Sequence, residues 1–236
     1  MVPDAPERVT AALFEITRRQ PPQPPAIPAL KFSIAISRET GAGGNRLAAL
    51  VGERLGWPVY DHELVEKIAA DLHVRVGLLE AVDERHVSWL QERMEAFAAV
   101  PFVGENTYVR QLVETVLSLS LRGHAVIVGR GAPHIMSHGS TLTVRLVGQL
   151  DDRVKTVIQE QKLSHDAAVR LVRATDAQRL RFVRDHFQCD PTDPVLYDLV
   201  LNSSRFSIEQ CADLVVDALA KRQRKTVASA PTPSAL

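Results

Sequence analysis

The sequence predicts an α/β fold in which a parallel β-sheet carries helices on both faces. Short, mostly apolar segments of strand composition alternate along the chain with longer segments of helical periodicity. Such an alternation is typical of a parallel sheet whose strands are buried on both sides. The length of 236 residues, with 45% hydrophobic residues, is sufficient for one α/β domain with a sizeable core.

The expected elements follow one another in a regular order. Strands are expected at 31–37, 57–60, 124–128, 141–147 and 198–201. Helices are expected at 45–56, 62–72, 77–122 with a break near 100–104, 151–162, 164–187 and from 208 onward. Asn45 is expected to cap the first of these helices at its start, and Gly56 at its end. Ser207 and Gln210 form a capping box at the start of the last helix.

Both ends of the chain differ from this core in composition. Residues 1–30 are expected to form an N-terminal extension, with a short helix at 6–19 and a proline-rich linker at 20–25 that favours extended backbone. The core domain is expected at 31–221. Residues 222–236 end in Ala, Ser, Thr and Pro, a composition that predicts a disordered tail.

The charge balance, with 28 basic and 28 acidic residues, argues against a broad surface field that recruits nucleic acid or anionic membranes. No apolar stretch approaches the length that crosses a membrane, and the first residues lack the order of a signal peptide. The two cysteines, Cys189 and Cys211, form neither a C-x-x-C motif nor a disulfide framework. We therefore expect a cytoplasmic protein with no membrane and no nucleic-acid partner.

The first expected strand leads into a glycine-rich loop, Gly41-Ala42-Gly43-Gly44, and then into a helix. Glycines allow successive backbone N–H groups to converge on an anion, and the helix adds the positive end of its dipole. This order is that of a phosphate-binding loop. The full motif G-x-x-x-x-G-K-[ST] is incomplete, because Gly44 stands in place of the lysine, Asn45 in place of the hydroxyl residue and Arg38 in place of the first glycine.

Polar residues also follow the other expected strands, and ligands of such sheets bind at the carboxyl ends of the strands. Those ends carry Ser37-Arg38, Tyr60-Asp61, Gly129-Arg130 and Asn202-Ser203. A separate group of arginines at 179, 181 and 184 lies in one expected helix. It forms either a solvated face or a lid whose guanidinium groups clamp phosphoryl oxygens.

Several blocks of the sequence resemble the cytidylate kinase-like family, a branch of the P-loop nucleoside monophosphate kinases. They occur in the family's order over residues 32–220, and together they are far more specific than one glycine loop. The blocks are Ser37-Arg38-Glu39-Thr40-Gly41-Ala42-Gly43-Gly44, similar to S-R-E-x-G-x-G-G; Pro58-Val59-Tyr60-Asp61-His62-Glu63-Leu64, similar to P-x-Y-D-x-E-L; Val126-Ile127-Val128-Gly129-Arg130, similar to V-I-V-G-R; and 176–182 with 197–204, similar to the lid and last strand.

The resemblance implies a P-loop NTPase-type parallel sheet flanked by helices, with a helical monophosphate-binding region and a mobile lid. It implies phosphoryl transfer from ATP to CMP or dCMP, with Mg²⁺. The donor phosphates would be held by Arg38 and the backbone of Gly41, Ala42, Gly43, Gly44, Asn45 and Arg46, and the donor base would lie near Asn202 and Ser203. Asp61 and Glu63 would begin the acceptor site. The catalytic charge would come from Arg130, Arg179, Arg181 and Arg184.

Two departures from the family pattern keep a second function open. Many cytidylate kinases proper carry a lysine in the loop and an Asp after the Gly-Arg pair, where this chain has Gly44 and Gly131. An active enzyme then needs charge from elsewhere, and we expect Arg130 and Arg181 to supply it first. The alternative is a nucleotide-binding regulatory module with little or no kinase activity.

Three further features are less specific. His134 and His138 have the i, i+4 spacing of a zinc pair, without a further ligand residue nearby in the sequence. Nothing around Cys189 argues for a reactive thiol. The helices at 77–122 could cover the monophosphate site or pair with another copy of the chain, so a homo-oligomer is one alternative. The sequence does not identify the Mg²⁺ ligands.

Overall fold

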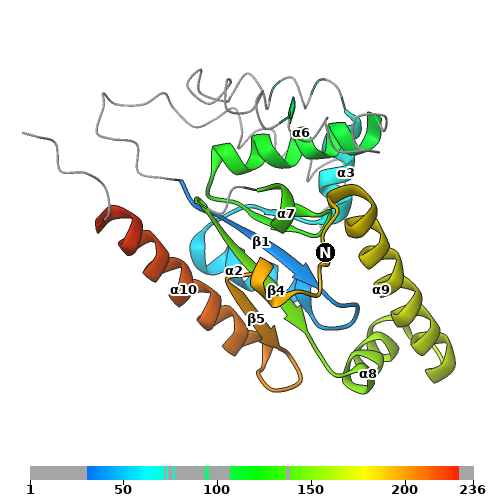
Figure 1. The fold of residues 1–236 in the computed structure, drawn as a ribbon. Helices are drawn as coiled ribbons and strands as arrows, with labels where there is room; N and C mark the ends of the chain where they lie inside the picture. Colours follow the sequence, from blue (N-terminus) through cyan, green and yellow to red (C-terminus); the bar gives the residue numbers. More distant parts are fainter. Residues whose placement is uncertain are drawn as a thin grey trace, which may run out of the picture.

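A computed structural model describes residues 31–71, 73, 77, 94, 95, 107–136 and 139–228 of the chain (Figure 1). The expected N-terminal extension at 1–30, most of the expected helical region between 72 and 106, His138, and residues 229–236 lie outside the described residues.

In the described part of the chain, five parallel strands form the sheet in the order β2-β3-β1-β4-β5, which confirms the predicted parallel sheet. Strand β1 is central and pairs with β3 on one side and β4 on the other, so that Ile36 lies opposite both Val128 and Val144. The strands are β1 (Ser33–Arg38), β2 (Val59–Tyr60), β3 (Val126–Val128), β4 (Thr141–Val147) and β5 (Leu199–Asn202).

Helices cover both faces of the sheet because its strands are apolar on both sides. One face packs against α2 (Gly44–Leu55) and α10 (Ile208–Ala228), and buries Ile34 and Ile36. The opposite face packs against α3 (His62–Ala70), α6 (Thr107–Arg122) and α7 (Ala132–Ile135), and buries Ala35. Successive residues of β1 thus point into two separate cores, as the alternation of a strand requires.

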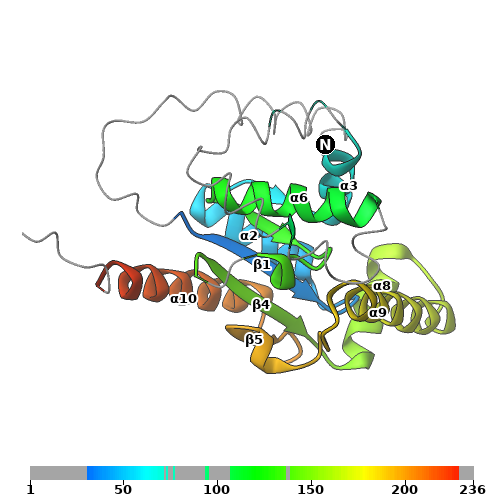
Figure 2. The ribbon, with the colours of Figure 1, turned by 45° about the horizontal axis from the view of Figure 1, so that its top comes forward.

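The carboxyl edge of the sheet faces two further helices, α8 (Leu150–Gln161) and α9 (His165–Phe187). In Figures 1 and 2 these helices lie beyond the tips of the strand arrows, whereas α6 and α10 run along the faces of the sheet. A turn containing the short 3-10 helix η1 (Pro194–Leu196) leads from α9 back to β5. Residues that end β1 and β3 therefore lie between the sheet and α9.

Several expected element ends are confirmed by their caps. Gly56 ends α2 in the left-handed conformation, and Ser164 caps α9 by accepting from the N–H of Ala167. Ser207 and Gln210 bond reciprocally at the start of α10, as a capping box does.

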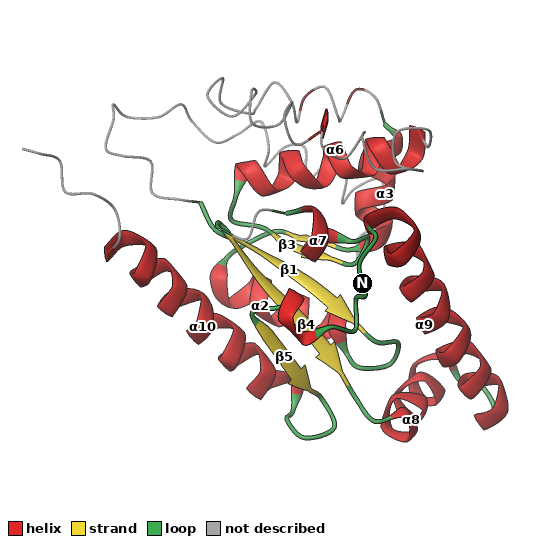
Figure 3. Cartoon of the chain, in the orientation of Figure 1, coloured by secondary structure: helices red, strands yellow, loops and turns green. Residues whose placement is uncertain are grey.

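Two expectations about the ends of helices are wrong. Figure 3 shows α10 as one long helix beside the sheet. Helix α2 begins at Gly44 with Gly43 as its N-cap, so Asn45 lies inside its first turn and is not the cap. Gly43 can take this place because it adopts a φ of 86°. Helix α10 continues to Ala228, so residues 222–228 are helical where a disordered tail was predicted. An ion pair between Arg222 and Asp198, the residue before β5, ties this part of α10 to the sheet.

Candidate functional site

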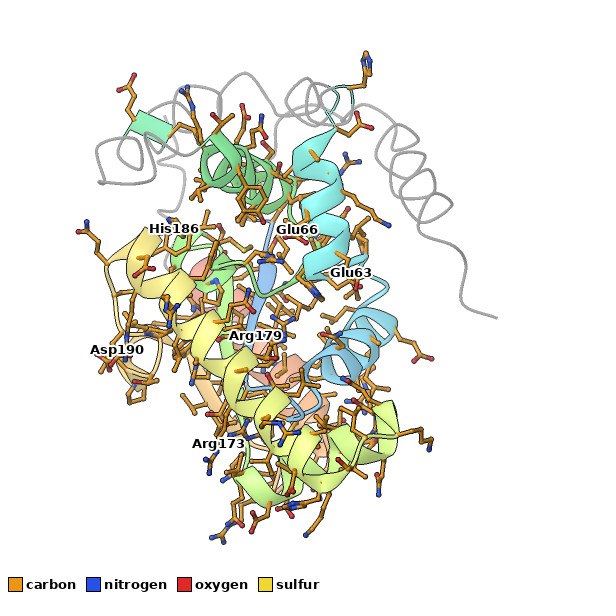
Figure 4. All side chains as sticks on the ribbon, turned by 90° about the vertical axis from the view of Figure 1, so that its right-hand side faces the viewer. Glu63, Glu66, Arg173, Arg179, His186 and Asp190 are labelled. Atoms are coloured by element: carbon orange, nitrogen blue, oxygen red, sulfur yellow. The ribbon has the colours of Figure 1, made fainter. Side chains whose placement is uncertain are left out.

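A cavity of about 280 Å³ lies at the carboxyl edge of the sheet, between the ends of β1 and β3 and the inner side of α9. Its wall contains four arginines and two histidines, together with apolar residues of α9: Arg38, Arg130, Arg145, Arg179, His62, His134, Leu180, Phe182 and Val183. Figure 4 views the molecule from this edge, with Arg179 midway along α9 and Glu63 and Glu66 on α3. The cavity therefore lies at the edge of the sheet where the rule of strand carboxyl ends predicts a ligand site.

The glycine-rich loop joins β1 to α2 in the strand–loop–helix arrangement that the sequence predicts. Gly41 and Gly43 have φ values of 79° and 86°, which other residues rarely adopt. A Cβ at position 41 would overlap the backbone carbonyl of Arg153, and one at position 43 would lie 2.6 Å from Cδ1 of Ile208. The loop thus packs closely against α8 at Gly41 and against α10 at Gly43, and the φ values at both positions favour glycine. The first N–H groups of α2 have no partner within the helix, as at every helix start.

Gly44, which replaces the lysine of the phosphate-loop motif, makes room for the side chain of Arg38. A Cβ at position 44 would lie 2.5 Å from Cγ and 2.7 Å from Cβ of Arg38. The Arg38 guanidinium group extends toward Gly129, where an added Cβ would overlap its Nη1 atom. The arginine from the end of β1 therefore passes over the start of α2, close to where a lysine side chain at position 44 would begin.

The segment after β3 has three consecutive positive φ values, 80° at Gly129, 50° at Arg130 and 70° at Gly131. Such a conformation is costly for an arginine, and strained residues of this kind cluster at functional sites. The turn directs Arg130 to Glu66 of α3, with an Nη2–Oε1 distance of 2.5 Å, and over the ring of Phe182. A Cβ at position 131 would overlap the ring of Phe187, so the second departure from the family pattern also makes room for a side chain.

The cavity concentrates positive charge. Burial, together with the guanidinium groups of Arg179 and Arg130, lowers the pKa of Arg38 from its usual 12.5 to about 9, although Asp61 opposes this. Burial also lowers the pKa of Arg179, which Asp176 raises and Arg130 lowers. The guanidinium groups of Arg130 and Arg179 thus disfavour the charged form of Arg38, and that of Arg130 disfavours the charged form of Arg179. Such a site favours an anionic ligand, because negative charge between them relieves the repulsion.

Helix α9 is fastened to the glycine-rich loop by two of its side chains. The carboxylate of Asp176 accepts from the backbone N–H of Thr40 at 2.8 Å and from Nη1 of Arg153 at 2.6 Å. Arg179 donates to Oγ1 of Thr40 at 3.0 Å. Arg153 in turn pairs with Glu39, at 3.3 Å, so that α8, α9 and the loop form one network. The region that resembles a lid lies in contact with the loop.

The residues predicted from the sequence divide into two groups. The structure brings Arg38, Arg130 and Arg179 together at the cavity, with Asp61 close enough to influence Arg38. Other predicted residues lie outside the cavity wall: Arg46, paired with Glu209; Arg184, paired with Asp190; Arg181 and Glu63, both exposed; Asn45 in the first turn of α2; and Ala42, buried in the core.

Asp61, Asn202 and Ser203 have structural contacts of their own. Asp61 caps α3 by accepting from the N–H of Leu64 at 2.9 Å. Asn202 accepts from the N–H of Ser204, and Ser203 donates from its hydroxyl to the carbonyl of Val147 at 3.1 Å. The roles of these residues toward a nucleotide stay predictions.

His62, Arg145 and Asp176 also line the cavity, and they were not predicted as site residues from the sequence. Arg145 is buried in β4 and contacts Ser37 Oγ at 3.4 Å, Glu39 at 3.8 Å and the ring of Tyr197. A charged residue inside an apolar strand was the available signal. For Asp176 the signal was its spacing from Arg179, since positions three apart share one side of a helix.

The sequence features that suggested a metal do not form a site in the described part of the chain. His134 contacts Cys189, with 3.6 Å between Nδ1 and Sγ, and Tyr197, whereas His138 lies outside the described residues. Burial and Asp190 raise the pKa of the Cys189 thiol. The described residues contain no group of three His, Cys, Asp or Glu side chains that could hold a metal ion. Within the same ranges, no helix combines the length and apolarity needed to span a membrane.

Comparison with known proteins gives one long match and several partial ones. A sequence profile described as the cytidylate kinase-like family matches residues 33–205. A cytidylate kinase from Methanopyrus kandleri is 29% identical over 87 residues, covering 36% of this chain and 45% of that protein. A uronate isomerase from Corynebacterium glutamicum is 27% identical over 125 residues, covering 53% of this chain and 24% of that protein. The chain therefore spans less than half the length of either curated relative.

Among solved structures, an uncharacterized protein from Eubacterium ventriosum has the same fold. Its TM-score is 0.66 at 21% sequence identity, and the match covers 81% of this chain and 99% of that chain. The similarity in fold thus extends over most of the described residues.

Proposed function

The chain belongs to the cytidylate kinase-like family, and we propose that it is a phosphotransferase that moves the γ-phosphoryl group of ATP to CMP, dCMP or a related nucleoside monophosphate. The observation that carries this proposal is the meeting of Arg38, Arg130 and Arg179 at one cavity beside the glycine-rich loop. Phosphoryl transfer needs little covalent chemistry from a protein. It needs the two substrates in line and positive charge around the transferred group.

Arg38 is the residue best placed to supply the charge of the missing lysine. Its side chain begins beside Gly44 and ends beside Gly129, next to the start of α2. Arg130 and Arg179 approach from the β3 turn and from α9, so phosphoryl oxygens could be bound from three directions. Charge-assisted bonds of this kind are about twice as strong as neutral ones.

The described residues fit the phosphates of ATP better than they fit a metal ion on its own. Nε of Arg130 is buried and has no hydrogen-bond partner among the described residues, as expected where a ligand completes the bonding. We propose that the first turn of α2 holds the donor phosphates, and that Asn202 and Ser203 lie near the donor base. Mg²⁺ keeps several waters and binds largely through substrate phosphates in such enzymes, where it neutralises charge.

The acceptor would enter from the side of α3. Asp61 and Glu63 begin that helix, and Glu66 holds Arg130 from it. Closure of α9 over both nucleotides would exclude water, which protects ATP from hydrolysis. The two free cysteines suit a reducing compartment, and we propose the cytoplasm.

A coupled assay with the full chain, ATP, Mg²⁺ and a panel of CMP, dCMP, UMP and AMP tests this proposal. We expect turnover with at least one pyrimidine monophosphate. The absence of turnover with every member, at high enzyme concentration, would refute it.

A second function is favoured by one observation. Asp176 accepts from the N–H of Thr40, and Arg153 anchors that carboxylate, so side chains of the protein itself join the loop to α9. A nucleotide-binding regulatory module could use such a stable junction as its resting state. This alternative predicts calorimetric binding of ADP or ATP without turnover.

A further inference from the structure

His62 is the first residue of α3 and lines the same cavity. Its Nδ1 atom is buried and has no hydrogen-bond partner among the described residues. Nε of Arg130, on the same cavity wall, has none there either. A buried polar atom without a partner costs free energy, and two of them on one wall indicate that something else completes their bonding.

The charges around His62 come from three elements. Arg38 reaches it from the end of β1 and Arg130 from the turn after β3, while Glu63 and Asp61 belong to the start of its own helix. Burial lowers the pKa of His62 below its usual 6.5, and both arginines lower it further, whereas Glu63 and Asp61 act weakly in the opposite direction. The imidazole ring is therefore neutral at neutral pH when no anion is bound.

We propose that His62 is a phosphate-binding residue that takes up a proton from solvent when a phosphoryl group enters the cavity beside Arg38 and Arg130. The inference rests on the proposed function in taking this cavity as a phosphate site. An anion there offsets the two guanidinium groups and favours the charged imidazolium form. The proton is taken up at Nδ1, which then donates a hydrogen bond to a phosphoryl oxygen. No other bond forms or breaks.

The sign of the pH dependence follows from this linkage. Bound phosphate raises the pKa of His62, and by reciprocity the protonated ring raises the affinity for phosphate. The affinity for phosphate is lowest at pH values above the His62 pKa of the phosphate-bound protein. It increases as the pH falls toward the lower His62 pKa of the free protein. Within that window the increase reaches about tenfold per pH unit for one proton.

Histidine NMR on the full chain tests whether a bound anion raises the pKa of His62, and it requires no turnover. Inorganic sulfate is the probe, because it exchanges no proton near neutral pH. We expect saturating sulfate to raise the pKa of His62 and to leave the NMR signals of His165 unchanged, since the side chain of His165 is 72% exposed on α9. A His62 pKa that sulfate does not move, or a ring already charged at neutral pH without sulfate, would overturn the proposal.

Calorimetry with ADP in buffers of different ionisation enthalpy tests whether His62 takes up a proton when ADP binds. The wild type should take up about one more proton than His62→Gln for each ADP bound, and His165→Gln should match the wild type. Proton exchange by ADP itself contributes equally to all three. Equal uptake by the wild type and His62→Gln contradicts the proposal. If His62→Gln does not fold, the NMR result on the wild type decides. Proton uptake without turnover of any monophosphate would refute the proposed kinase activity and leave this inference standing.

Discussion

The carboxylate of Asp176 on α9 accepts a hydrogen bond from the backbone N–H of Thr40, in the loop after β1, at 2.8 Å. A residue in the middle of a long helix thus fixes the loop for which the sequence predicts phosphate binding. The same carboxylate pairs with Nη1 of Arg153 at 2.6 Å, and the side chain of Asp176 is 21% exposed. The contact between lid-like helix and loop therefore consists of short, largely buried, charge-assisted bonds.

Replacing Asp176 by Asn should destabilise the protein, because it leaves Arg153 with less compensation for its charge. We expect a loss of about 2–3 kcal/mol in the free energy of unfolding, measured by chemical denaturation. Asp185→Asn on the exposed side of the same helix is the matched control and should change stability by less than about 0.5 kcal/mol. Equal effects of the two substitutions would contradict a specific role of the Asp176 contact.

Replacing Arg38 by Met should lower the affinity for ADP by roughly tenfold to a hundredfold, the usual cost of a charge-assisted hydrogen bond. Methionine keeps the stem that packs on Gly44 and removes the charge. Calorimetry measures the effect. Arg54→Met on α2 removes an arginine that pairs with Asp213 at the protein surface, and should bind ADP as the wild type does. An unchanged affinity in Arg38→Met would mean that Arg38 does not replace the missing lysine.

Replacing Gly44 by Lys should not restore a normal phosphate-binding loop. The new Cβ would lie 2.5 Å from Cγ of Arg38, so we expect destabilisation of about 1–3 kcal/mol from overpacking, measured by chemical denaturation. Adding Arg38→Gly removes both carbon atoms that the new Cβ would meet, because Cβ of Arg38 alone would lie 2.7 Å from it. The double variant should therefore be more stable than the sum of the two single effects predicts. Simple additivity would show that the two side chains do not compete for one space.

Replacing Arg179 by Met should lower kcat by about 10²–10³ if its charge acts on the transferred group. Arg173→Met, exposed on the same helix, is the control and should retain the wild-type kcat. The sequence alone led us to expect catalytic charge from Arg181, whereas in the structure Arg181 is exposed and lies outside the cavity wall. We therefore expect Arg181→Met to keep most of the wild-type kcat. A loss in Arg181→Met as large as that in Arg179→Met would show that the reacting state uses a different face of α9.

The fold and part of the site could be predicted because they depend on local rules. Apolar strands between helices indicated the parallel sheet, and the rule of carboxyl ends led to Arg38 and Arg130. The choice among the α9 arginines depended on which side of the helix meets the loop. Buried Val172 and Val183 flank Asp176 and Arg179 at helical spacing, and that pattern marks the inner side.

Other features depended on contacts between distant segments. In the sequence, Gly44 stands where the phosphate-loop motif has a lysine. In the structure, Gly44 leaves space for the side chain of Arg38. Gly131 reads as a missing Asp and accommodates Phe187, which lies far along the chain. Tertiary packing alone leaves Nδ1 of His62 without a hydrogen-bond partner among the described residues. It also brings the buried Arg145 within 3.4 Å of Ser37 Oγ. Sequence periodicity carries no information about such contacts.

We propose that three arginines from separate elements supply the charge for phosphoryl transfer at this cavity. The rate of ADP formation by the wild type and by Arg130→Met, with ATP, Mg²⁺ and the best acceptor of the panel, tests this proposal. Circular dichroism should first show that both proteins are folded. We expect turnover by the wild type and a decrease in kcat of about 10²-fold or more in Arg130→Met. Wild-type turnover that Arg130→Met retains in full would show that Arg130 does not act on the transferred group.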